Sequence, residues 1–186
     1  MREPAKRKAT YEDLYSVPEN MIGEIIGGGL IVHPRPSPKH MRAATRLSAE
    51  LELPYGGNGV PGGWIFLLET EIQLVEDIVV PDVAGWKKER FPAHIETNWI
   101  PVPPDWVCEI LSPKTALRDR TAKKEIYAQA QVGHLWLVDP LNMTVEVYRL
   151  GSGAFDAAGV YGGDDKARLE PFTEIEIDLG SLWLES

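Results

Sequence analysis

Cysteine is the scarcest chemically informative residue in this chain. The 186 residues include one cysteine, Cys108, so no disulfide can form within the chain. Proteins of oxidising compartments commonly pair their cysteines, and a single cysteine therefore favours a reducing, cytoplasmic location. One cysteine and four histidines also provide no spacing typical of a structural zinc site.

Long apolar runs are absent as well. No segment approaches the roughly 18 consecutive apolar residues of a membrane-spanning helix, and the basic start, MREPAKRKAT, has no apolar stretch behind it as a secretory signal has. We therefore expect no membrane partner. The length and the 44% hydrophobic fraction suit one domain over residues 1–186, with residues 1–9 loosely held.

Positive charge is in short supply. The chain has 19 lysines and arginines against 28 aspartates and glutamates, which gives a net charge of −9. This balance argues against a protein that coats nucleic acid non-specifically, because such proteins neutralise phosphates with basic side chains. Acidic residues that cluster can instead hold a cation. One basic cluster does occur within eleven positions: Lys114, Arg118, Arg120, Lys123 and Lys124.

Two common catalytic motifs are missing. The glycines at 27–29 lack the lysine and helix of a phosphate-binding loop. No strand-to-helix serine motif of the hydrolase type is present either.

The distribution of apolar residues predicts an α/β fold with a mixed sheet. Alternation over 64–75 predicts one half-exposed strand, and the apolar run at 134–140 predicts a strand buried on both faces. The remaining predicted elements are a short helix at 11–19, a hairpin at 23–34, a helix at 39–53, a strand at 77–86 interrupted by Pro81, a strand at 105–111, a helix at 116–131, strands at 144–150 and 174–179, and a glycine-rich loop at 151–163.

Two carboxylates stand in predicted strands that are otherwise apolar. Asp82 and Glu109 are 27 positions apart (109 − 82), which suits neighbouring strands joined by a loop. A buried carboxylate is costly unless it is paired or binds a metal. Two carboxylates from adjacent strands form a hard-oxygen site suited to Mg²⁺ or Mn²⁺.

A lysine joins them from the predicted helix at 116–131. At about 100° per residue, Ala122, Ile126, Tyr127 and Ala130 define an apolar arc, and Lys123 lies inside it. A lysine on the core-facing side can pair with a carboxylate, hold a water or stabilise developing negative charge. From these residues alone, a catalytic site and a structural ion pair remain equally good interpretations.

Longer motifs around these residues resemble a known family. VVPDVAGW contains Pro81-Asp82, and the stretch from Glu109 to Pro140 is EILSPKTALRDRTAKKEIYAQAQVGHLWLVDP. With the N-terminal segment EIIGGGLIVHPRPSPKH, these motifs resemble the Uma-type restriction endonuclease family of the PD-(D/E)XK nuclease superfamily. The resemblance spans nearly the whole chain, and its central stretch is its most specific part.

The resemblance implies a restriction-endonuclease-like mixed central sheet flanked by helices, with additional N-terminal and C-terminal strands. It implies that Asp82, Glu109 and the backbone carbonyl of Ile110 hold Mg²⁺ or Mn²⁺ for hydrolysis of DNA phosphodiesters. The superfamily's usual lysine position, two residues after the second carboxylate, is occupied here by Leu111. The resemblance places the lysine on the following helix, at Lys123. Members that cut both strands often pair two active sites, so a homodimer also follows from the resemblance.

Three further residues are auxiliary candidates. Glu24 matches a glutamate of the family and either joins the site or is a polar residue near a hairpin. His40 either joins the site or makes local hydrogen bonds at a helix start, and the local role is favoured. Asp119 either bonds Lys123 at i,i+4 or is an acidic first-turn residue, and the first-turn role is favoured. Tyr127 is interpreted as a core residue.

Two hypotheses of function follow. The first is a metal-dependent endonuclease that hydrolyses DNA with a metal-activated water. The alternative is a non-catalytic nucleic-acid-binding or regulatory domain that retains the nuclease fold, which the acidic charge keeps open.

Overall fold

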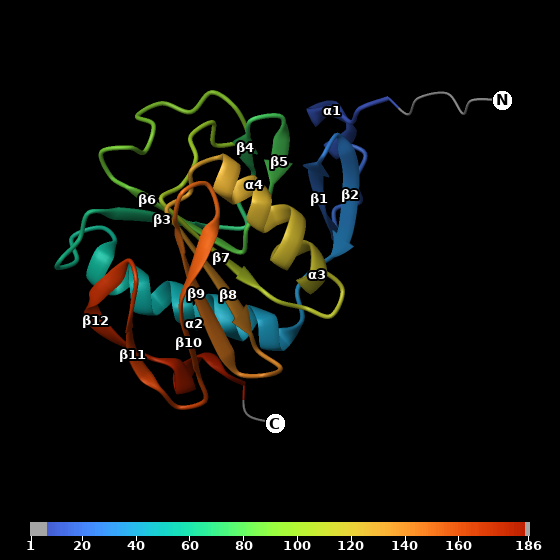
Figure 1. Ribbon diagram of the computed structural model, residues 1–186. Helices are drawn as coiled ribbons and strands as arrows, with labels where there is room; N and C mark the ends of the chain where they lie inside the picture. The colour runs from blue at the N-terminus through green and yellow to red at the C-terminus, as the bar shows by residue number, and fades with distance from the viewer. Residues whose placement is uncertain (1–6, 185–186) are drawn as a thin grey trace.

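The computed structural model describes residues 7–184, which form three β-sheets and several helical segments (Figure 1). In chain order, the elements are α1 (Tyr11–Leu14), β1 (Met21–Ile26), β2 (Gly29–Pro34), α2 (Pro38–Tyr55), β3 (Trp64–Leu68), β4 (Ile72–Leu74), β5 (Asp77–Val79), β6 (Val83–Lys87), β7 (Trp106–Ile110), α3 (Ala116–Arg118), the π-helical η1 (Asp119–Lys123), α4 (Lys124–Gln129), β8 (His134–Asp139), β9 (Thr144–Leu150), β10 (Phe155–Gly162), β11 (Lys166–Leu169), β12 (Phe172–Asp178) and the 3₁₀ segment η2 (Leu179–Leu182).

A six-stranded mixed sheet forms the centre, in the order β10-β9-β8-β7-β6-β3. Strands β7 and β8 are parallel, and the other neighbours are antiparallel. Parallel neighbours need a long crossover, and α3, η1 and α4 provide it between β7 and β8. The predicted α/β class with a mixed sheet is therefore confirmed.

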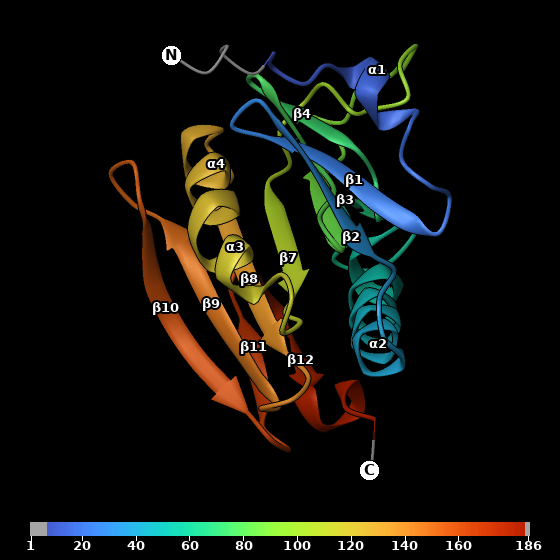
Figure 2. The same ribbon diagram turned by 90° about the vertical axis from the view of Figure 1, so that its right-hand side faces the viewer.

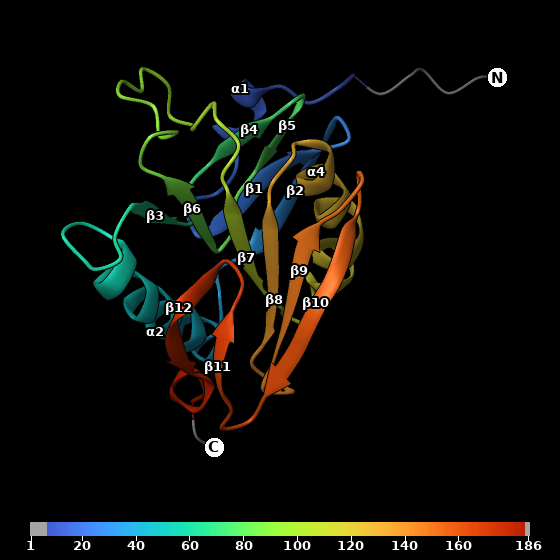
Figure 3. The ribbon, with the colours of Figure 1, turned by 60° about the vertical axis from the view of Figure 1, so that its left-hand side comes forward.

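The two faces of this sheet have separate apolar cores. On β7, Trp106, Cys108 and Ile110 pack into the core that contains the buried side chains of α2, whereas Val107 packs into the core that contains Tyr127 of α4. Figures 2 and 3 show α2 on one side of the sheet and the α3–α4 segment on the other. Because strand side chains alternate between faces, Glu109 points to the α4 side.

A second sheet, in the order β2-β1-β5-β4, contains the predicted hairpin at 23–34 as β1 and β2. The chain leaves this sheet at Val79, at the end of β5, and enters the six-stranded sheet at Val83, at the start of β6. Asp82 therefore lies at the junction of the two sheets. The hairpin of β11 and β12 forms a third sheet, and β12 contacts α2 (Figure 3).

One predicted strand is wrong in its extent, and a second divides at the proline that was expected to interrupt it. The segment 64–75 divides into β3 and β4, which belong to different sheets, and Glu69 between them has a positive φ of 46° that turns the chain. The segment 77–86 divides at Pro81, which has no N–H to continue a ladder. Alternating polarity continues through the break at Glu69, so the pattern did not mark it, whereas an interruption at Pro81 was expected.

The predicted glycine-rich loop at 151–163 is also wrong, because β10 occupies most of it as the edge strand beside β9. An edge strand exposes much of its surface, so its sequence lacks the apolar pattern of a core strand.

Residues 1–9, at the start of the chain, were expected to be loosely held. The first six of them lie outside the described part of the structure. Arg7 pairs with Asp13 at 2.7 Å, and Lys8 pairs with Glu76 at 2.7 Å. Both cations are exposed, and the loosely held start stays a prediction.

Candidate active site

A cavity of about 410 Å³ lies where the β1–β2 hairpin, the end of β7 and η1 meet. We call it the acidic cavity because Glu24, Asp82, Glu109 and Asp119 line it together with Lys123. Its lining also includes Glu69, Arg35 and Lys114, so five carboxylates face three cationic side chains. This imbalance of charge favours binding of a further cation.

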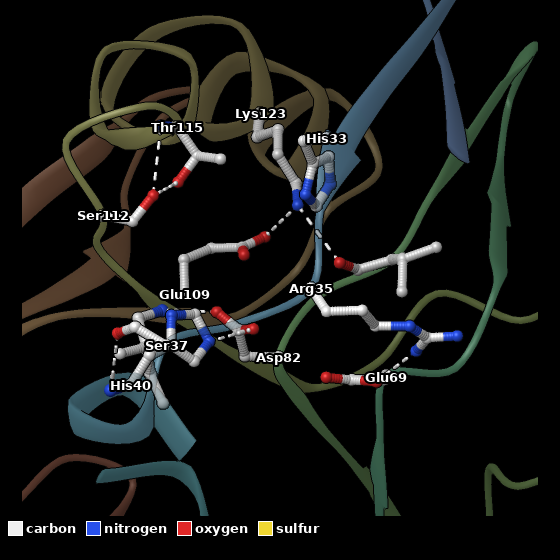
Figure 4. A network of polar contacts seen from close by, with 12 residues as sticks. His33, Arg35, Ser37, His40, Glu69, Asp82, Glu109, Ser112, Thr115 and Lys123 are labelled. Carbon is white, nitrogen blue, oxygen red and sulfur yellow. Dashed lines mark hydrogen bonds and ion pairs between the residues drawn. The ribbon is translucent and has the colours of Figure 1, made fainter. Parts of the chain in front are cut away.

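Asp82 is tied to the end of β7 and to the start of α2 (Figure 4). Its Oδ2 accepts a hydrogen bond of 2.6 Å from the backbone N–H of Ile110, and its Oδ1 lies 2.6 Å from Nε2 of His40. The carboxylate is fixed in position, and its side chain keeps 16% of its surface exposed toward the cavity.

Glu109 is 3% exposed and points into the acidic cavity from β7. Its Oε1 accepts a hydrogen bond from the hydroxyl of Tyr127 and lies 2.7 Å from Nζ of Lys123. No hydrogen bond to Oε2 is present among residues 7–184. Burial raises the pKa of Glu109 well above its usual value, which the charge of Lys123 offsets only in part.

Lys123 is also buried, and its ammonium group has three acceptors, of which Figure 4 labels Glu109. Nζ lies 2.7 Å from Oε1 of Glu109, 2.9 Å from Oε1 of Glu24 and 3.4 Å from the carbonyl oxygen of Val80. Burial alone would lower the pKa of Lys123, but the two carboxylates raise it well above its usual value. The side chain is therefore held as a cation.

Glu24 reaches this group from β1. Its Oε1 accepts a hydrogen bond of 2.8 Å from the N–H of Val80, and its Oε2 lies 3.4 Å from Nε2 of His33. Burial would raise the pKa of Glu24, yet Lys123 and these hydrogen bonds lower it to about 2. Glu24 was interpreted either as part of the site or as a polar residue near a hairpin. In the structure, it lies beside Lys123 and lines the cavity with the other candidate residues.

The helix that carries Lys123 is irregular at the cavity. Residues Asp119–Lys123 form a π-helical segment, and such segments occur frequently at functional sites. Asp119 is buried and lines the cavity, and burial raises its pKa. The favoured interpretation, in which Asp119 is only an acidic residue at the helix start, is incomplete. The helical segment already begins at Ala116, and Asp119 lines the cavity.

His40 lies in the first turn of α2, where the Ser37 side chain accepts a 3.4 Å hydrogen bond from its N–H. The local role expected for His40 is thus present, and its ring also contacts Asp82. Nδ1 of the same ring is buried and has no partner among the described residues.

Tyr127 is the residue whose role the sequence did not predict. It is fully buried, as a core residue is, but its hydroxyl bonds to Glu109. Burial and the charge of Glu109 raise its pKa well above the usual value, so the hydroxyl stays protonated and donates. Its spacing of four positions after Lys123 was the available signal, because residues four apart share a helix face.

The backbone carbonyl of Ile110, predicted to be a third metal ligand, lies at the end of β7. Extending the β6–β7 register by two residues places Pro81 opposite Ile110. The N–H of Ile110 points to Asp82, and the carbonyl of a strand residue points to the same side as its N–H. Proline has no N–H that could donate to the carbonyl of Ile110.

In residues 7–184, no three His, Cys, Asp or Glu side chains are grouped as ligands of one metal ion.

The mixed sheet and the acidic cavity with its buried lysine define a protein with a restriction-endonuclease-like fold. The chain belongs to the Uma2 family, which is described as "Putative restriction endonuclease" and whose profile matches residues 9–180. Among solved structures, the chain is similar to a "putative nuclease belonging to DUF820" from Anabaena variabilis ATCC 29413.

That similarity has a TM-score of 0.76 at 23% sequence identity, and it covers 94% of this chain and 97% of the other. The predicted family and fold are therefore confirmed. The comparison with curated proteins found no match. Across residues 7–184, no helix is both long and apolar enough to cross a membrane.

Proposed function

We propose that this protein is a divalent-metal-dependent endonuclease that hydrolyses phosphodiester bonds of DNA. The observation that carries the proposal is the acidic cavity, where Asp82 and Glu109 lie together with a buried, charged Lys123. Membership of a family described as restriction endonucleases supports the same class of reaction.

The donors fit Mg²⁺ or Mn²⁺ better than zinc. Mg²⁺ takes oxygen ligands, uses one or two carboxylates and keeps several waters, so it needs no group of three protein side chains. Asp82, the free Oε2 of Glu109 and the carbonyl of Ile110 are the oxygen donors that would hold it. A bound divalent cation would supply an activated water and offset negative charge on the phosphate.

The residues of the chain have separate roles in this proposal. Lys123 stabilises the charge that develops on the phosphate or holds the attacking water. An ammonium group has three N–H donors, and all three have acceptors here, so a water or phosphate oxygen has to replace one. The contact with Val80 is the longest, at 3.4 Å, and is the one we expect to be replaced.

Cleavage of supercoiled, linear and single-stranded DNA with Mg²⁺ or Mn²⁺ tests the proposal, with EDTA as the metal-free control. Asp82→Ala and Glu109→Ala are expected to abolish cutting and to weaken metal binding measured by calorimetry. Lys123→Ala is expected to abolish cutting while metal binding persists. Cutting that continues in EDTA, or that survives all three substitutions, would contradict the proposed site.

A second candidate is a non-catalytic nucleic-acid-binding or regulatory domain on the same fold. The hydrogen bonds that already occupy both oxygens of Asp82 favour it, as does the net charge of −9. Absence of both cutting and metal binding in the wild-type protein would select this candidate.

We further propose that residues 1–186 form one nuclease-like domain that acts in the cytoplasm as a homodimer. The single free cysteine, Cys108, fits a reducing compartment. Two copies would supply the two active sites that cutting both strands requires. Light scattering on the purified protein tests the dimer, and a monomer at micromolar concentration would contradict it.

A further inference from the structure

Two basic side chains stand at the border of the acidic cavity. Arg35 comes from the loop between β2 and α2, and Lys114 comes from the loop between β7 and α3. Both are exposed. A protein with a net charge of −9 that binds a polyanion has to place positive charge where the polyanion lies.

The basic cluster found in the sequence disperses in the structure, and Lys114 is its exposed member at the border of the cavity. Lys123 is buried at the carboxylates, Arg120 is held in an ion pair, and Lys124 lies over an aromatic ring. Arg118 has a buried guanidinium nitrogen. Lys114 makes no ion pair or side-chain hydrogen bond within residues 7–184, so its ammonium group is available to a ligand.

Arg35 is anchored but retains free donors. Its Nη1 donates to Glu69 at 3.2 Å (Figure 4), and its Nη2 donates to the carbonyl of Glu19 at 3.0 Å. A guanidinium group has five N–H donors in a fixed fork, so the two contacts leave others for an oxyanion. The ion pair with Glu69 is exposed on both sides, and such surface pairs are weak, so an oxyanion can compete for this guanidinium group.

We propose that Arg35 and Lys114 bind DNA phosphate groups that flank the phosphate at Asp82 and Glu109. This inference rests on the proposed nuclease function and names the part of the site that holds the substrate backbone. Neither cation contacts the carboxylates that carry the chemistry, so each contributes to binding and positioning of DNA. Substitution is therefore expected to raise KM and leave kcat within about twofold of the wild-type value.

The chain offers a matched control for each residue. Arg149 pairs with Glu170 at 3.1 Å with 61% and 38% side-chain exposure, close to the 54% and 37% of the Arg35 pair. It lies on β9, outside the border of the cavity. Lys166 on β11 is an exposed lysine outside that border and is the control for Lys114.

The test compares Arg35→Gln and Lys114→Gln with Arg149→Gln and Lys166→Gln. Binding of a labelled duplex is followed by fluorescence anisotropy from 50 to 200 mM salt, with Ca²⁺ replacing Mg²⁺. Each lost phosphate contact lowers the slope of log affinity against log salt by about 0.9 on duplex DNA. The ratio of wild-type affinity to the affinity of Arg35→Gln or of Lys114→Gln, the two cavity variants, should then fall about threefold from 50 to 200 mM salt.

The control variants are expected to keep the wild-type slope and KM. If the wild-type protein cuts DNA but the cavity variants behave like their controls, the inference about Arg35 and Lys114 is overturned and the nuclease proposal stands. If the wild-type protein neither binds nor cuts DNA, both are overturned. Thermal melting of all four variants shows whether a change in KM reflects loss of fold.

Discussion

Lys123→Met separates the role of Lys123 in stability from its role in chemistry. The substitution keeps an unbranched side chain of similar length and removes the charge, which leaves Glu24 and Glu109 buried without their shared partner. Removing one member of a buried ion pair costs about 3–5 kcal/mol. At about 2–4 °C per kcal/mol for a chain of this size, the melting temperature should fall by roughly 6–20 °C.

The loss should depend on pH. Burial already raises the pKa of Glu109, and without Lys123 it rises further. A carboxyl whose pKa is higher in the folded state favours folding below its unfolded pKa and loses that contribution as pH rises through the folded pKa. The stability gap between wild type and variant should therefore widen once the pH exceeds the folded pKa of Glu109 in the wild-type protein, as measured by thermal melts followed by circular dichroism.

A neighbouring lysine and a double variant complete the experiment. Lys124→Met removes an ammonium group 3.5 Å above the Tyr148 ring, a contact worth about 0.5–1 kcal/mol, and should cost little. Glu24→Gln added to Lys123→Met removes one unpaired charge and should restore part of the melting temperature. Cleavage should stay lost in the double variant, because the ammonium group is still missing.

Two results would refute this reasoning. A Lys123→Met protein that melts like Lys124→Met would show that the buried ion pairs do not stabilise the fold. Cleavage that returns in the double variant would show that Lys123 serves stability alone.

The remaining predictions concern groups near the same cavity. Tyr127→Phe removes the hydroxyl that donates a hydrogen bond to Glu109, so it should lower the free energy of unfolding by about 1.5–3 kcal/mol and weaken metal binding, measured by calorimetry, about tenfold. The control is Tyr55→Phe, because the hydroxyl of the buried Tyr55 bonds a carboxylate on the opposite face of the sheet. This control should leave metal binding unchanged. The pKa of Glu24 is lowered from 4.5 to about 2, so this carboxylate contributes stability above pH 4.5 that is lost as the pH falls toward 2. Glu24→Gln should therefore flatten the fall in stability between pH 4.5 and pH 2 in an acid titration. An unchanged fall would contradict the ion pair between Glu24 and Lys123. Burial raises the pKa of the Cys108 thiol, and labelling of the native protein should be slower than in denaturant by on the order of a hundredfold or more; rapid native labelling would show that this core opens.

Much of the architecture followed from local patterns. The apolar run at 134–140 predicted the buried strand β8, and the helical arc predicted that Lys123 faces inward. These signals are reliable because side-chain periodicity is set by backbone geometry within a single element. The split of 64–75 at Glu69 was not predictable in this way, since a single turn residue redirected the chain into another sheet.

The residues of the candidate site divide along the same line. The sequence identified Asp82, Glu109 and Lys123 by type, by apolar neighbours and by resemblance to the family motifs. Sequence patterns did not predict which groups each of them contacts. Tyr127 was interpreted as core because its periodicity is that of a core residue, and a hydroxyl at the end of a buried ring leaves no mark on that pattern.

By itself, the sequence determined the fold class, the family and the residue types at the candidate site, because periodicity and motifs are properties of neighbouring positions. Only the tertiary structure decided that Glu24 and Glu109 both pair with the ammonium group of Lys123, which lies 99 positions after Glu24 (123 − 24). It also decided that Lys114 is exposed at the border of the cavity while its basic neighbours are paired or buried. Contacts between distant segments depend on how two sheets and a crossover helix pack together, and a local pattern contains no record of that packing.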